Sequence, residues 1–250
     1  MMDLSFVHYS EIDSTSTEIR RRIEAGENVE GLVITADSQT FGRGRSGKSF
    51  ESADGKGLYF SMAVKACNSA ETGNLACWAA VACANALKEQ CGLDVSFKWV
   101  NDLIVNEKKL GGILLELVPS ADFGNFIVIG IGINCGQRSA EFGSEIENLA
   151  ISLVMLGIEC RPKDLAEKLA LSLNTVLSGF PGNKPYVLAE YRARCITVQK
   201  VIYLIDGDLK KKVFSKCIND NFALVCISED GKETEVRSGE VSVRGINGYI

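Results

Sequence analysis

Histidine is almost absent from this chain of 250 residues, which contains a single one, His8. A histidine-rich metal site is therefore excluded, and a Ser-His-Asp or Cys-His mechanism would depend on one residue near the N-terminus. The nine cysteines include no C-x-x-C pair, which excludes zinc ribbons and thioredoxin-like redox motifs. Because their number is odd and several lie among apolar residues, we interpret them as reduced, mostly buried thiols of a cytoplasmic protein.

Long apolar runs and excess positive charge are also lacking. The longest apolar stretch, around Phe126–Ile133, is far shorter than a membrane-spanning helix. Residues 1–13 are too acidic and too interrupted for a signal peptide. The net charge of −5 argues against a general binder of nucleic acid or of anionic membranes. With 46% hydrophobic and 24% charged residues, the composition is that of a folded protein with a packed core.

The hydrophobic pattern predicts an α+β domain over residues 1–194 and a small all-β domain over residues 195–250. Helices are expected directly after Ser14, with a capping box from Thr15 to Glu18, and over Asn74–Cys91, Ser144–Leu156, Lys163–Ser178 and Tyr186–Arg194. Strands are expected over Leu32–Ala36, Gly57–Val64, Val95–Trp99, Leu103–Asn106, Lys109–Val118 and Asn125–Ile133. Short β-type runs after Cys195, separated by turns such as Asp206-Gly207, predict a barrel of about five strands.

A basic, glycine-rich segment, Gly42–Ser49, fits both the G-x-G-x-x-G and the P-loop patterns. Both patterns require a helix to begin there, so that its first amides hold phosphates. The continuation, Phe50–Gly57, is rich in turn formers and disfavours that helix. Arg43, Arg45 and Lys48 still concentrate positive charge in an otherwise acidic protein, and guanidinium groups suit carboxylates and phosphates. We therefore predict an anion-binding loop, with a solvated basic turn as the alternative.

Two lysines form the second cluster of interest, Lys98 in the segment Lys98–Asp102 and Lys109 in the segment Lys109–Glu116. The small glycines that follow Lys109 allow a strand to approach a ligand closely. A cation in such a place needs an anionic partner. Taken singly, each side chain could also be an ordinary lysine at a strand edge.

Taken together, these segments resemble the biotin protein ligases. Four blocks carry the resemblance, namely Asp13-Ser14-Thr15-Ser16 with Gln39, Gly42–Gly47, Lys98–Glu116 and Gly130–Asn134. The segment Gly239–Arg244 resembles the end of that family's C-terminal domain. The blocks keep the family's order and spacing over nearly the whole chain, which is far more specific than a single glycine motif.

The resemblance implies an α+β fold with a mixed sheet and helices on one side, as in class II aminoacyl-tRNA synthetases and biotin ligases, and a small C-terminal SH3-like β-barrel. It implies an ATP-dependent, AMP-forming ligase that makes biotinyl-5′-AMP, usually with Mg²⁺, and transfers biotin to a lysine of a biotin carboxyl carrier domain. Family members often pair through sheet edges, so a homodimer is compatible with the resemblance. Because the chain starts directly with the catalytic domain, we expect no DNA binding.

The resemblance also implies roles for individual residues. Lys109 matches the lysine that contacts the biotin carboxyl group and the phosphate, and Arg43, Arg45 and Asp102 complete the implied catalytic set. The implied biotin-binding residues are Ser14, Thr15, Ser16, Gln39, Gly42, Arg43, Gly44, Arg45, Lys109, Gly112 and Gly132. The implied ATP-binding residues are Arg43, Arg45, Lys48, Phe50, Lys98, Asn101, Lys109 and Asn134. No metal ligands are assigned.

The chain departs from the family pattern at several positions. Ser16 replaces the usual Asn, which should weaken or reroute one contact to biotin, and Val100 replaces the usual Pro. Phe50 stands where Trp is common, and either ring can stack on adenine. Ser46 and Lys48 replace common arginines, and we expect this to change how the enzyme retains the adenylate intermediate. None of these changes removes a required functional group.

Three alternatives stay open at this point. A lipoate protein ligase shares the fold and the adenylate chemistry, although the Gly-Arg-Gly-Arg and Lys-Trp-x-Asn-Asp blocks favour biotin. A P-loop NTPase would require a helix directly after Ser49. A binding module without catalysis would require loss of Lys109 or of the basic loop, and both are present.

Overall fold

A seven-stranded mixed sheet forms the centre of the protein in the computed structural model, which describes residues 1–44, 50, 52–67, 70–144, 146–237, 242–245 and 249. The strand order is β1-β2-β3-β7-β6-β5-β4, with β1 parallel to β2 and every other pair antiparallel. The strands are β1 (Ser5–Ile12), β2 (Leu32–Gln39), β3 (Gly57–Lys65), β4 (Ser96–Lys98), β5 (Asp102–Val105), β6 (Lys108–Val118) and β7 (Phe126–Asn134).

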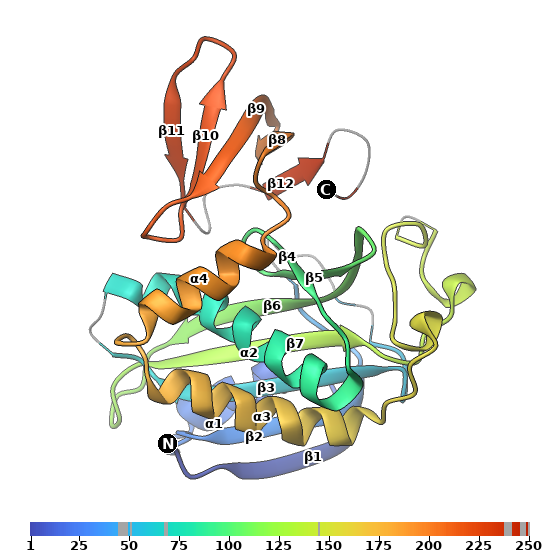
Figure 1. The fold of residues 1–250 in the computed structure, drawn as a ribbon. Coiled ribbons are helices and arrows are strands. Elements are labelled where there is room, and N and C mark those ends of the chain that lie inside the picture. Colours follow the sequence, from blue (N-terminus) through green and yellow to red (C-terminus); the bar gives the residue numbers. More distant parts are fainter. Residues whose placement is uncertain are drawn as a thin grey trace.

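Helices cover both faces of this sheet, so the prediction of helices on one side is wrong. On one face, α1 (Thr15–Glu24) buries Ile19 and Ile23 against Ile34 and Val128 of the sheet. On the other, α2 (Leu75–Cys91), α3 (Pro162–Ser178) and α4 (Lys184–Arg194) share the larger core. Figure 1 shows α2 and α3 in front of the sheet and α1 behind it. Both faces of the central strands are apolar, and each face therefore needs a cover.

The ends of two helices follow local rules. The predicted capping box at Thr15 is wrong by one residue, because Ser14 is the N-cap and its Oγ accepts from the Thr17 amide at 3.4 Å. The stop predicted for α2 is confirmed, since Gly92 adopts the left-handed conformation at φ +64° and its amide donates to the carbonyl groups of Leu87 and Lys88.

The helix predicted over Ser144–Leu156 is wrong. The described residues of that segment form turns and a short 3₁₀ helix, η4 (Val154–Leu156). Here the backbone pairs with the start of β6, because the Lys109 amide donates to Leu149 at 2.7 Å and the Ile151 amide donates to Lys109 at 2.9 Å. Pairing with another strand satisfies the groups that a helix would have satisfied internally. The other 3₁₀ helices are η2 (Ala70–Asn74) and η3 (Ser139–Glu141).

A second sheet contains the five strands predicted after Cys195, in the order β11-β10-β9-β8-β12. They are β8 (Lys200–Asp206), β9 (Leu209–Ile218), β10 (Leu224–Ser228), β11 (Glu233–Val236) and β12 (Ser242–Gly245). All neighbours are antiparallel. Among the described residues, β11 and β12 are the edges and do not pair with each other, so the sheet is not a closed barrel there. Figure 1 shows this sheet at the top of the view, above α4 and apart from the large sheet.

Candidate active site

A cavity of about 790 Å³ brings together residues that are far apart in the sequence. The residues predicted for the site that line it are Ser14, Thr15, Ser16, Gln39, Arg43, Gly44, Phe50, Lys98, Asn101, Asp102, Lys109, Gly112, Gly132 and Asn134. Gly42 lies outside this wall, where its carbonyl accepts from the Phe50 amide at 2.9 Å. Arg45 and Lys48 lie outside the described residues.

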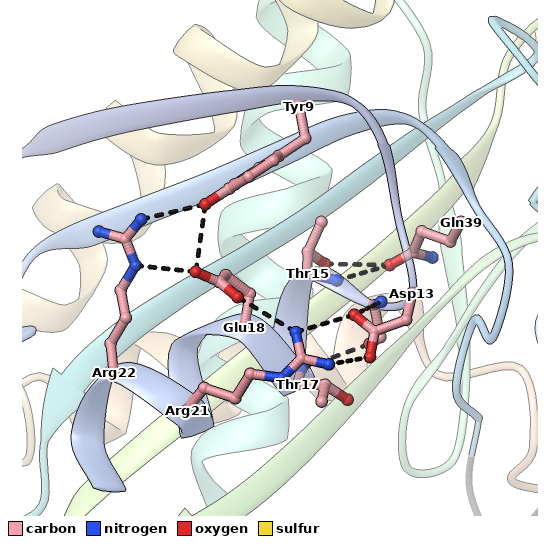
Figure 2. A network of polar contacts seen from close by, with 9 residues as sticks. Tyr9, Asp13, Thr15, Thr17, Glu18, Arg21, Arg22 and Gln39 are labelled. Atoms are coloured by element: carbon pink, nitrogen blue, oxygen red, sulfur yellow. Dashed lines mark hydrogen bonds and ion pairs between the residues drawn. The ribbon is translucent and has the colours of Figure 1, made fainter. Parts of the chain in front are cut away.

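One end of the cavity is neutral and made of hydroxyl and amide groups. Ser14, Thr15 and Ser16 are buried at the start of α1. The Thr15 amide and hydroxyl donate to Gln39 Oε1 at 2.9 and 3.2 Å, as Figure 2 shows. The hydroxyl oxygens of Thr15 and Ser16 lie 2.7 and 2.8 Å from Ser61 Oγ. Hydroxyl and amide groups can both donate and accept, so this end suits an uncharged ligand group with donors and acceptors side by side.

Two glycines of β7 give the cavity its depth. A Cβ at Gly130 would lie 2.7 Å from Ser16 Oγ, and one at Gly132 would lie 2.6 Å from the Phe50 ring. Both distances are below any real contact, so side chains at these positions would displace the wall. The Phe50 ring also meets Tyr59 edge-on, with centroids 6.4 Å apart. An aromatic ring on a bare strand surface offers a flat partner for another planar group.

The other end of the cavity is positively charged. Lys109 Nζ lies 2.6 Å from Asp102 Oδ1, and the Tyr249 hydroxyl donates to Asp102 Oδ2 at 2.6 Å. Lys98, which is only 2% exposed, lies with its Nζ 3.6 Å from the centroid of the Tyr249 ring. Arg244 of β12 also lines the wall. Two lysines thus act on one carboxylate, with Arg244 on the same wall, and the excess positive charge suits an anion such as a phosphate.

Asp102 is ionised in this environment. Its burial alone would raise the pKa of the carboxyl group. The positive charge and hydrogen bond of Lys109, the charge of Lys98 and the hydrogen bond from Tyr249 outweigh burial and hold that pKa below its usual value. The carboxylate therefore holds the Lys109 side chain at the cavity wall through the ion pair.

Backbone contacts hold the two predicted asparagines. Asn101 donates from Nδ2 to the Ile113 carbonyl at 2.7 Å, and Asn134 donates to the Ile151 carbonyl at 3.1 Å. Both bonds use the amide nitrogens of the side chains. Gln137 Nε2 lies 3.5 Å from the Asn134 oxygen.

Arg43 is bound by a carboxylate that the sequence reasoning did not include. Its Nη1 lies 2.9 Å from Glu116 Oε1, and the same oxygen accepts from Arg20 at 2.8 Å. Arg20 belongs to α1 and Glu116 to β6. This ion pair thereby links Arg43, near the start of the basic segment, to strand β6 of the large sheet.

Sequence reasoning also missed Ser61, Tyr249 and Glu141. Ser61 had a readable signal, because it is a hydroxyl within the otherwise apolar strand Gly57–Val64. Glu141 lines the wall and pairs with Lys56 at 3.1 Å. Tyr249 had no signal, because no local pattern indicates its contact with Asp102, which is 147 residues away in the sequence.

The described residues hold no cluster of three or more His, Cys, Asp or Glu side chains arranged for a metal ion. No helix in the part of the chain that the structure describes has the length and apolar character needed to cross a membrane. The described residues 52–56 form an irregular segment and a turn before β3, as expected from their turn formers, and residues 45–49 and 51 lie outside the described part.

Comparison with known proteins shows which family has a similar sequence in the region of this cavity. Residues 9–134, which include most of its wall, match the biotin/lipoate A/B protein ligase family. The chain belongs to this family. Its structure is similar to that of the biotin protein ligase from Aquifex aeolicus in complex with biotin and ATP, with a TM-score of 0.83, 28% identity and coverage of 96% of this chain and 99% of that one.

The chain is also similar in sequence to two curated relatives. It is 33% identical over 237 residues to the bifunctional ligase/repressor BirA of Escherichia coli, covering 93% of this chain and 72% of that protein. It is also 33% identical over 146 residues to the protein of the same name from Bacillus spizizenii. That second match covers 58% of this chain and 45% of the relative, so the chain spans less than half of that relative's length.

Proposed function

We propose that this protein is an ATP-dependent biotin protein ligase, which activates biotin as biotinyl-5′-AMP and transfers it to a lysine of a biotin carboxyl carrier domain. One observation carries the proposal: a single cavity has a neutral, hydroxyl-lined end and a cationic end around Lys109. The ureido ring of biotin needs neutral donors and acceptors, whereas its carboxylate and the triphosphate need positive charge. Both ends of the cavity thus match one substrate pair.

The first step joins two anions that repel each other. The biotin carboxylate attacks the α-phosphorus of ATP, the bond to the β-phosphate oxygen breaks, and pyrophosphate leaves. Lys109, held by Asp102, is proposed to contact the biotin carboxylate and to stabilise charge that builds on the α-phosphate. Arg43 and Lys98 add positive charge along the same wall. Arg45 and Lys48 are proposed to complete the cationic cradle.

The second step transfers biotin to the carrier. The neutral amine of the carrier lysine attacks the carbonyl carbon of the mixed anhydride, AMP leaves with the bonding electron pair, and the nitrogen loses one proton to solvent. Ser14, Thr15, Ser16 and Gln39 are proposed to hold the ureido head throughout. Phe50, which packs on Gly132, is proposed to stack on the adenine.

Several finer features belong to the same proposal. Mg²⁺ is bound in many enzymes largely through substrate phosphates, and we propose that it enters this site together with ATP. We further propose a division into residues 1–194 and 195–250, an SH3-like barrel for the second part, and a cytoplasmic location. Pairing into a homodimer through a sheet edge is consistent with the exposed edge strand β1.

The test is mass spectrometry of an apo carrier domain incubated with the protein, biotin and ATP. We expect a mass gain of one biotin on the carrier, and none when its acceptor lysine is replaced by arginine or when ATP is omitted. A lipoyl domain with lipoate and ATP forms the second arm. Modification of the lipoyl domain without biotinylation of the carrier would replace this proposal with lipoate ligation.

A further inference from the structure

Tyr249 lines the cavity, although it lies far in the sequence from most other residues of the wall. Tyr249 is the penultimate residue, yet its hydroxyl donates to Asp102 Oδ2 at 2.6 Å across 147 residues of sequence. Its ring lies 3.6 Å from Lys98 Nζ and 5.5 Å from the Arg244 guanidinium carbon. Tyr249 thus contacts two of the charged groups around which the proposed chemistry is arranged.

Asp102 is held on both oxygens. Lys109 binds Oδ1 and Tyr249 binds Oδ2, each at 2.6 Å. A carboxylate with one oxygen bound can still rotate about its χ2 angle, whereas two short bonds on opposite oxygens fix its plane. The orientation of the Lys109 ammonium follows from that plane, because Asp102 is its ion-pair partner.

The Tyr249 hydroxyl is suited to this role. Burial and the Asp102 charge raise its pKa above the usual value, so it stays protonated and donates. The aromatic ring also covers the Lys98 ammonium, a contact that is favourable in a site shielded from water. Both parts of the side chain therefore act on groups of the cavity wall.

We propose that Tyr249 is a positioning residue of the adenylation step: it fixes Asp102, and through Asp102 the Lys109 ammonium, in the orientation that the transition state needs. The proposal rests on the function proposed above. Tyr249 is not a catalytic residue in this scheme, since it acts through Asp102.

The opposite role would be a plug, in which the tyrosine occupies space that the nucleotide needs. The two roles predict opposite changes in activity when the tyrosine is altered. Removing a positioning hydroxyl lowers the turnover of adenylate formation and leaves substrate binding nearly unchanged. Removing a plug raises the rate or tightens the binding of ATP.

The experiment compares the full-length protein with its Tyr249→Phe variant, which loses the hydroxyl and keeps the ring. Biotin-dependent exchange of pyrophosphate into ATP gives kcat and KM for the first step. We expect kcat to fall about tenfold, the effect of losing one charge-assisted hydrogen bond, with KM for biotin changed less than about twofold. Tyr186→Phe is the matched control, because Tyr186 is half exposed on α4, and it should keep wild-type kinetics.

A second measurement separates positioning from a general loss of structure. The Asp102 carboxyl can be titrated by NMR in both proteins, and loss of the Tyr249 hydrogen bond should raise its pKa. Lys109, Lys98 and Arg244 are the other charged groups that line the cavity there, and they are unchanged in the variant. An unchanged or raised kcat, or an unchanged Asp102 pKa, would overturn the inference.

The two proposals fail differently. If the wild-type protein shows no biotin-dependent exchange, the proposed function fails, and the Asp102 titration still decides whether Tyr249 holds the carboxylate. If the wild type is active and Tyr249→Phe matches it, the function stands and the inference about Tyr249 fails.

Discussion

At the scale of the residue, the ion pair of Lys109 and Asp102 is the central contact at the charged end of the cavity. The Asp102 side chain is only 12% exposed, whereas that of Lys109 is 31% exposed and reaches the cavity. Asp102 is therefore the more buried partner, and Lys109 is the one that we propose meets the ligand. Lys98 and Tyr249 also act on Asp102, so the carboxylate keeps partners if Lys109 is lost.

Lys109→Ala should slow adenylate formation by about 100-fold or more, the usual effect of removing one charged stabiliser of a transition state. Pyrophosphate release in the presence of biotin and ATP measures this step, and thermal unfolding checks that the variant is folded. Lys108→Ala is the matched control, because Lys108 is the neighbouring residue of β6 and lies outside the cavity wall. Wild-type pyrophosphate release from Lys109→Ala would contradict the catalytic role.

At the scale of the element, α1 is held in place by a network of ion pairs at its first turns. Glu18 accepts hydrogen bonds from Tyr9 at 3.1 Å and from Arg21 and Arg22 at 3.2 and 3.1 Å, as Figure 2 shows. Arg21 also binds Asp13, which precedes the N-cap. The network attaches α1 to β1 beside the neutral end of the cavity, so the position of Thr15 depends on it.

Glu18→Gln should lower the free energy of unfolding at neutral pH by about 1 kcal/mol. Partial burial opposes ionisation of Glu18, but its hydrogen bonds with Arg22, Arg21 and Tyr9 lower the pKa of the carboxyl group. Because the pKa of Glu18 is lower in the folded state, the ionised carboxylate stabilises the fold at pH values above the unfolded-state pKa near 4.5. This stabilisation is lost as the pH falls through the folded-state pKa. The difference between wild type and variant should therefore shrink between about pH 5 and pH 3.

Denaturant unfolding across that pH range measures the effect. Glu24→Gln, an exposed glutamate of the same helix, is the control. A difference between wild type and Glu18→Gln that is equally large at pH 3 and pH 7 would show that the carboxylate charge is not responsible.

At the scale of the whole molecule, the two sheets share one hydrophobic core. Phe222, just before β10, lies with its ring centroid 5.0 Å from that of Trp78 in α2 and 6.1 Å from that of Tyr191 in α4. Its carbonyl accepts from Trp99 Nε1 at 2.9 Å. Trp99 directly follows Lys98, so packing between the sheets also fixes a residue of the charged end of the cavity.

Phe222→Ala should destabilise the protein by about 3–5 kcal/mol, because it leaves a cavity where both layers meet. The midpoint of unfolding in guanidinium chloride measures the loss. Phe214→Ala, a phenylalanine of β9 that is 36% exposed, should cost less than about 1 kcal/mol. Equal costs for the two variants would mean that the layers are not coupled through Phe222.

Much of the fold could be predicted from the sequence, and the failures have physical causes. Strands β2, β3, β5, β6 and β7 and helices α2, α3 and α4 follow from their periodicity within a few residues. β1 was not predicted, because its exposed edge position lets polar residues alternate irregularly with Phe6 and Val7. The segment around Leu149 has a helical pattern, but its backbone pairs with Lys109. Pairing partners that are distant in sequence leave no local signal.

Residue types and their spacing were enough to identify the chemical groups and the elements that carry them: the hydroxyls at the start of α1, the glycines of β6 and β7, and the lysines on β4 and β6. Local patterns and spacing are sufficient for this, because they act over a few residues. Three features emerge only in the folded protein: the carboxylate that holds Lys109, the position of α1 on the opposite face from α2, and the contact of Tyr249 with Asp102. Those contacts depend on packing between segments up to 147 residues apart, which no local pattern encodes.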